Sequence, residues 1–197
     1  MPNEQRILLE QFRPGCDNRF LWCCGGYRRW ELEERGARRF WQLASDWGQA
    51  TVAGFVTPRR DFALEVEFDL SQLPQGELAV TLCSRLRVGK LGVDGLQFYA
   101  TPVGRVHLSQ ERLTFALDGR EAASAPGPVE LSVAPASLSW CVDAEGTASL
   151  RVGNVALTAA GTHPDAPCFL LLSGNTGAPD PRGRFGEVTL WSSAARG

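Results

Sequence analysis

The most regular pattern in the chain is an alternation of apolar and acidic residues over positions 61–70, DFALEVEFDL. A period of two residues places the two sets on opposite faces of a β-strand. The apolar set is Phe62, Leu64, Val66, Phe68 and Leu70, and the acids are Glu65, Glu67 and Asp69. The pattern predicts a strand with one face in a core and a strip of carboxylates, about 6.6–6.8 Å apart, on the other.

Short apolar segments recur along the rest of the chain at roughly ten-residue spacing, separated by Gly, Pro, Asn and Asp. Strands are predicted at 6–12, 30–33, 40–43, 77–88, 96–101, 105–108, 113–117, 129–133, 138–142, 148–152, 155–157, 168–172 and 185–191. A helix competes with strands over 27–39, which is rich in helix formers, and 121–128 is predicted to be a loop. The whole favours an all-β fold, a two-sheet antiparallel jelly-roll sandwich.

The length of 197 residues fits one β-sandwich domain over positions 1–197. Its least regular part is a Trp-, Arg- and Cys-rich segment at about 13–48. The counts of 21 Gly and 12 Pro suit many strands joined by tight turns. No repeat of 20–50 residues divides the chain.

Charge and hydropathy exclude some classes of partner. The net charge of -2 argues against nucleic acid and against an anionic membrane surface. No apolar run approaches the ~18 residues that would span a bilayer. The opening MPNEQRILLEQF has no signal-peptide pattern, so we expect a cytoplasmic location with reduced thiols.

Three of the six cysteines, Cys16, Cys23 and Cys24, lie close together. A metal centre needs about four ligands at ordered spacing, and His107 and His163 are far along the chain. We therefore predict no metal site there, and a redox-active or disulfide-forming cluster stays an alternative.

A family resemblance enters through the succession of segments after position 40. DFALEVEFDL is followed by GELAVTLCSR, GLQFYAT, a Trp strand answered by LRVGNVAL, and the closing GRFGEVTLW. This order resembles the concanavalin A-like lectin/glucanase sandwich superfamily, nearest to 3-keto-disaccharide hydrolase-like and laminin-G-like domains. The resemblance implies the sandwich fold and a carbohydrate ligand. Because its motifs are core-packing patterns, it indicates fold more than activity.

Candidate binding residues follow from the face that the acids occupy. If neighbouring strands pair, Arg85, Arg87, Gln97 and Tyr99 share that face, where Arg and Gln donate hydrogen bonds to sugar hydroxyls and Tyr offers a ring. Trp47 in the irregular segment is the candidate for an exposed ring on which a sugar stacks, whereas the alternation places Trp140 on the core face of its strand. The predicted ligand-binding set is Glu65, Glu67, Asp69, Arg85, Arg87, Gln97, Tyr99 and Trp47.

Three functions fit these observations, and whether the chain is an enzyme stays open. The first is a lectin-like carbohydrate-binding module that needs no cofactor, with calcium as the alternative. The second is a glycoside hydrolase or lyase using Glu65, Glu67 or Asp69, although Glu-Val-Glu-Phe-Asp departs from the Glu-x-Asp-x-Glu order of sandwich glucanases. The third is a structural or protein-interaction domain with a protein partner. No hydrolase triad or nucleophile elbow is present in the sequence.

Overall fold

Strands make up almost all the regular structure of the residues that can be described. The computed structural model describes residues 4–10, 23–25, 30–35, 38–43, 49–56, 62–71, 77–91, 95–128, 131, 134–160, 168–175 and 184–193. The strands are β1 (Glu4–Glu10), β2 (Cys23–Gly25), β3 (Trp30–Arg35), β4 (Arg38–Leu43), β5 (Gln49–Val56), β6 (Phe62–Asp69), β7 (Glu77–Leu91), β8 (Gly95–Leu108), β9 (Arg112–Leu117), β10 (Arg120–Pro126), β11 (Ala136–Val142), β12 (Thr147–Val152), β13 (Val155–Ala160), β14 (Cys168–Asn175) and β15 (Arg184–Ser193). Within these ranges there is no helix long and apolar enough to cross a membrane.

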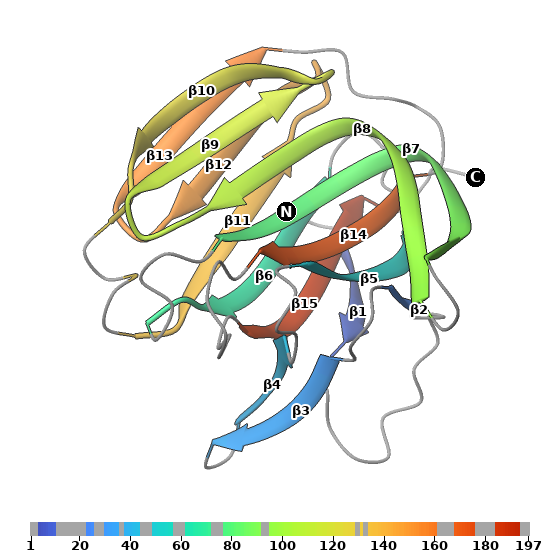
Figure 1. Cartoon of the computed structure of the whole chain (residues 1–197). Coiled ribbons are helices and arrows are strands. Elements are labelled where there is room, and N and C mark those ends of the chain that lie inside the picture. Colours follow the sequence, from blue (N-terminus) through green and yellow to red (C-terminus); the bar gives the residue numbers. More distant parts are fainter. Residues whose placement is uncertain are drawn as a thin grey trace.

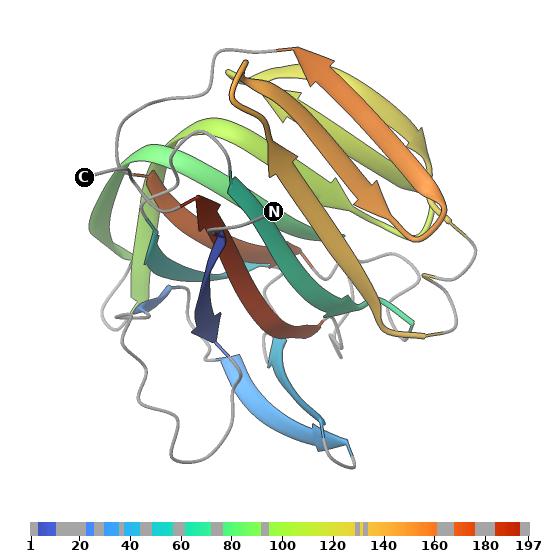
Figure 2. The ribbon, with the colours of Figure 1, turned by 180° about the vertical axis from the view of Figure 1, so that it is seen from behind.

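The strands form two antiparallel sheets stacked in two layers (Figure 1, Figure 2). Sheet A has the order β13-β12-β11-β6-β15-β4-β3, with β1 also paired to β15, and sheet B has the order β10-β9-β8-β7-β14-β5-β2. The edge strands β10 and β13 of the two sheets lie side by side in both views, which closes the sandwich at that end. The predicted all-β two-sheet sandwich is confirmed.

The core lies between the two sheets and follows the alternation read from the sequence. All five apolar residues of positions 62–70 are buried, and β7 contributes Leu78, Val80 and Leu82 from the opposite sheet. In a two-sheet sandwich, every second side chain of a strand faces the core and the others face outward. Strands β3 and β4 pair as a hairpin, so the strand interpretation of the 27–39 region holds and the helix alternative is wrong.

Two local predictions are wrong. Positions 120–126 form the strand β10, where a loop was expected; its backbone pairs with β9 although most of its side chains are exposed. An edge strand can be held by backbone hydrogen bonds without an apolar face, so hydrophobicity gave no signal. Leu131, expected in a strand, instead lies in a tight turn in which its N–H donates to the Pro128 carbonyl at 3.1 Å.

One large side chain connects the two sheets across the core. Trp140 of β11 is fully buried, as its parity predicted, and meets Phe115 of β9 edge-on with ring centroids 5.4 Å apart. Gly104 of β8 lies beneath the indole, where a Cβ would be 2.5 Å from Trp140 Cζ2. The absence of a side chain at Gly104 is therefore what allows the tryptophan to fit.

The β7–β8 hairpin is the longest in the fold and is interrupted by one bulge on each strand, near Cys83 and Pro102. Bulges bend a strand and increase its twist. In Figure 1 the two strands arch across the front of the molecule and then turn downward, so that β8 reaches β2 at the far edge of sheet B. The hairpin therefore has a proximal half inside the sheet and a distal half that extends beyond the bulges.

Candidate functional site

The predicted acidic strip lies on the outer face of sheet A, away from the other predicted site residues. Strand β6 pairs with β11 and β15, whereas β7 pairs with β8 and β14 in sheet B. The consecutive strands β6 and β7 thus lie in different layers. The expectation that Arg85, Arg87, Gln97 and Tyr99 share a face with the acids is wrong.

The three acids of β6 are not equivalent. Glu65 is exposed, Glu67 is half-buried and Asp69 is completely buried. Asp69 Oδ1 accepts hydrogen bonds from the Ser71 N–H at 2.9 Å and from the Ser71 hydroxyl at 2.6 Å. Because its carboxylate closes this turn, Asp69 does not extend the solvent-facing strip as expected.

Glu67 folds over the neighbouring strand at the bulge of β15. Its Oε2 accepts a long hydrogen bond from the Glu187 N–H at 3.5 Å, and the carboxylate lies where a Cβ on Gly186 would be. Glu187 in turn accepts a hydrogen bond from the Thr189 hydroxyl at 3.2 Å. The sheet A acids therefore participate in local contacts across β6 and β15.

The distal half of the β7–β8 hairpin carries most of the remaining predicted residues. Arg87 stands opposite Tyr99 and Arg85 opposite Thr101, and all four side chains are exposed. We call these four residues the hairpin face. Tyr99, 55% exposed, is the one large hydrophobic side chain among the described residues that is exposed. Gln97 occupies the register position opposite Gly89, two residues from Tyr99.

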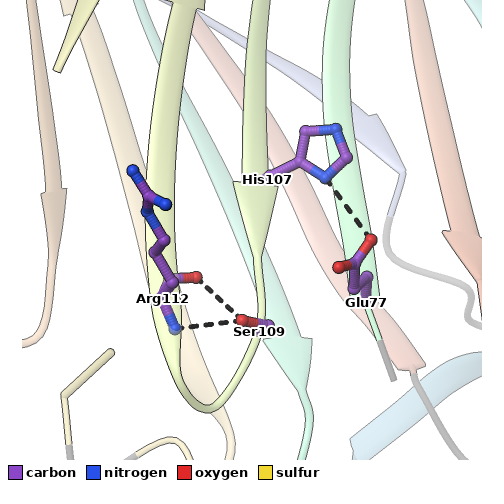
Figure 3. Close-up of polar contacts among 4 residues, drawn as sticks. All are labelled: Glu77, His107, Ser109 and Arg112. Atoms are coloured by element: carbon purple, nitrogen blue, oxygen red, sulfur yellow. Dashed lines mark hydrogen bonds and ion pairs between the residues drawn. The ribbon is translucent and has the colours of Figure 1, made fainter. Parts of the chain in front are cut away.

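Sequence reasoning missed a cluster on the outer face of sheet B. His107 and Arg105 alternate with the buried Val106 on β8, so both point away from the core. His107 Nδ1 lies 3.7 Å from Glu77 Oε2 at the start of β7 (Figure 3). The side chain of His107 is 35% exposed. The alternation of RVHL is the signal that could have identified it.

Burial shapes the electrostatics of this cluster. Desolvation lowers the pKa of the Arg105 guanidinium from its ordinary value, and the charge of Glu77 opposes that change. Desolvation is also the main cause that lowers the pKa of His107; the positive charge of Arg105 lowers it further and Glu77 partly opposes both. His107 is therefore neutral near pH 7, beside a permanently charged guanidinium.

Some predicted residues cannot be located. Cys16 and Trp47 lie outside the described residues, and Cys23 and Cys24 are described as part of the backbone of β2. In the described ranges, no three His, Cys, Asp or Glu side chains gather to hold a metal ion.

Comparison with known proteins gives a clear result for the fold. No family model matches the sequence, and no curated protein does. Among solved structures, the chain is similar to the exoplasmic/lumenal domain of VIP36 in its Ca²⁺/Man3GlcNAc-bound form, with TM-score 0.63, 12% identity and coverage of 90% of this chain and 88% of that one. The carbohydrate recognition domain of Emp47p matches with TM-score 0.62, 14% identity and coverage of 87% and 88%. This chain has a concanavalin A-like lectin fold.

The metal-free carbohydrate recognition domain of Emp46p extends the same likeness, with TM-score 0.59, 15% identity and coverage of 86% and 87%. Other matched forms of these proteins hold calcium or potassium. The concanavalin A-like resemblance expected from the sequence is thus confirmed. The expectation of a cytoplasmic location is wrong, because the VIP36 domains among the matches are exoplasmic/lumenal.

Proposed function

We propose that this chain is a lectin-like carbohydrate-binding module and that its hairpin face contacts the sugar. The lectin fold supports the class of function, since the matched domains are carbohydrate recognition domains or hold mannose-containing ligands. Fold alone does not specify an activity. The observation that carries the proposal is the exposed Tyr99 directly opposite Arg87.

The chemistry of a pyranose ring fits this pair. A sugar has an apolar C–H face that an exposed tyrosine ring can cover, and a rim of hydroxyls that accept hydrogen bonds from a guanidinium. Arg85 and Arg87 are both exposed, and neither has a hydrogen bond or ion pair with the described residues. Their donors are available to a ligand that stacks on Tyr99.

The hydrolase alternative is less well supported. A glycosidase needs two carboxylates that face one scissile bond. Of the three acids considered, Asp69 is buried and held by Ser71, and Glu67 accepts a hydrogen bond from the Glu187 backbone. Glu65 remains as the exposed acid of β6. We therefore assign binding to sheet B and no catalytic step to sheet A.

A glycan array followed by calorimetry tests the proposal. Tyr99→Ala should weaken binding of the best neutral glycan by roughly tenfold, because ring contact is worth about 0.5–1.5 kcal/mol beyond the area it buries. Tyr99→Phe keeps the ring and should retain most of the affinity. Arg87→Ala should weaken binding several-fold, at about 0.5–1.5 kcal/mol for a hydrogen bond. Arg151→Ala, an exposed arginine on sheet A, is the matched control.

The same binding experiment also tests whether calcium is required. We propose it as an optional ion, because some matched lectin domains hold calcium while the described residues gather no three His, Cys, Asp or Glu side chains. Binding is measured with added calcium and with a chelator. Equal affinity in both would remove the ion from the function. Absence of binding to every glycan under both conditions would refute the proposed function.

A further inference from the structure

The outer face of sheet B presents a second polar surface, separate from the hairpin face. In the register of the sheet, Thr81 of β7, Arg105 of β8 and Ala116 of β9 form one row, and the adjacent row is Ala79, His107 and Thr114. Ala79 and Thr81 are each only 4% exposed although they belong to this outer face. Neighbouring side chains therefore cover these two short residues. We call Arg105, His107 and Glu77 the proximal cluster.

Arg105 is the unusual member of the proximal cluster. Its Nε is buried and has no hydrogen-bond partner among the described residues, and none of them forms an ion pair with its guanidinium. Glu77, whose charge acts on Arg105, forms its ion pair with His107. A partly desolvated cation without a bonded partner is an unfavourable arrangement that a bound anion would relieve.

A neighbouring arginine on the same sheet shows the ordinary alternative. Arg112 Nη2 donates to Glu121 Oε1 at 2.8 Å and to the Ser124 hydroxyl at 3.0 Å, so β10 supplies its partners. In the row of Arg105, the flanking residues are the short Thr81 and Ala116. The residues directly beside Arg105 in the sheet are thus small and uncharged, and Glu121, which stands opposite Ala116 in the same row, is held by Arg112.

We propose that the proximal cluster binds the anionic group of an acidic sugar, a carboxylate or a phosphate, with Arg105 as the anchor. The proposal rests on the carbohydrate-binding function and specifies its ligand class. An ionised guanidinium matches the planar geometry of a carboxylate or phosphate and binds it through paired hydrogen bonds. The outer face of sheet B would then recognise the charged substituent of a glycan, while the hairpin face contacts a ring.

His107 makes this recognition depend on pH. The charged groups that face it are Glu77 from β7 and Arg105 from its own strand; the flanking Thr114 of β9 is uncharged, and Glu121 of β10 is held by Arg112. Below the lowered pKa of His107 a second positive charge joins Arg105. Binding of a carboxylate should strengthen as the pH falls through that range.

Calorimetric titration with three probes tests the proposal: glucose, glucuronate and glucose 6-phosphate. The wild-type protein should bind at least one acidic sugar about tenfold more tightly than glucose, as expected for a charge-assisted hydrogen bond. The two acidic probes distinguish a carboxylate ligand from a phosphate ligand. Arg105→Met should abolish the preference and leave glucose binding unchanged, whereas Arg151→Met should change neither. Circular dichroism confirms that each variant is folded.

A second arm uses glucuronate alone, because its carboxylate stays ionised over the range tested. Affinity should rise as the pH falls below about 6.5 in the wild-type protein and stay constant in His107→Gln. An equal affinity for glucose and the acidic sugars, or a preference that survives Arg105→Met, would overturn this inference. The proposed function would still stand if glucose binding depends on Tyr99. Absence of binding to all three probes would overturn the inference, and the proposed function would be refuted with it only if the glycan array also detects no binding.

Discussion

Gly104→Ala should destabilise the sandwich by about 2–3 kcal/mol, although the substitution adds one methyl group. The new Cβ would be 2.5 Å from Trp140 Cζ2 and 2.6 Å from Cη2, where carbon atoms normally approach to about 3.5–4.0 Å. Overpacking of this kind costs about 1–3 kcal/mol. We expect the upper part of that range because the indole is fully buried and is held edge-on by Phe115.

Urea unfolding followed by far-UV circular dichroism measures this loss, and the thermal midpoint should fall by roughly 5–10 °C for a chain of this length. Trp140→Phe removes the two ring carbons that clash, at a cost of about 1–2 kcal/mol for the cavity. In the double variant the two losses should not add, and the coupling should be about 1–2 kcal/mol. A cost for Gly104→Ala below about 0.5 kcal/mol, or simple additivity, would refute the packing argument.

Three further predictions concern single residues. The fold lowers the pKa of His107, so as the pH drops below ~6.5 the imidazole is protonated in the unfolded chain before it is protonated in the folded one. The free energy of unfolding should therefore fall over this pH range. In a plot of the urea midpoint against pH, His107→Gln should flatten this part of the curve. Asp69→Ala should cost about 1–3 kcal/mol in chemical denaturation, since both Ser71 donors lose their acceptor, with sugar affinity unchanged. Gly119→Ala should lower the thermal midpoint by the equivalent of about 1 kcal/mol, because a φ of 76° disfavours any residue with a side chain. No atom lies within 4 Å of the new methyl group, so the cost comes from the backbone alone. Full wild-type stability would contradict this.

Local patterns in the sequence were sufficient to predict much of the fold. The alternation around Val66 identified the core face of β6, and the parity of Trp140 placed it in the interior. Both rest on the two-residue period of a strand, which needs no knowledge of partners. The edge strand β10 escaped because the sequence REAASAP has neither β-branched residues nor an apolar face.

The site was harder to predict because it depends on which strands pair. Consecutive strands are neighbours in most sheets, and for that reason Glu65 and Arg87 were expected to share one face of a sheet. Here β6 and β7 lie in different sheets, so the two residues occupy different layers. The placement of His107 opposite Ala79 could have been obtained by counting back from the turn before Gly95, because the bulges on β7 and β8 cancel. The sequence offered no sign of those bulges.

The pairing of β6 has a consequence for how the protein is made on the ribosome. One neighbour of β6 is β15, and the contact between Glu67 and Glu187 spans 120 residues. At about 5–20 residues per second, β6 waits roughly 6–24 s for that neighbour to be synthesised. During this interval one long side of β6 has unsatisfied backbone groups next to its apolar residues, which is the kind of surface that chaperones cover. Sheet A becomes continuous only when β15 joins β6 to β1 and β4.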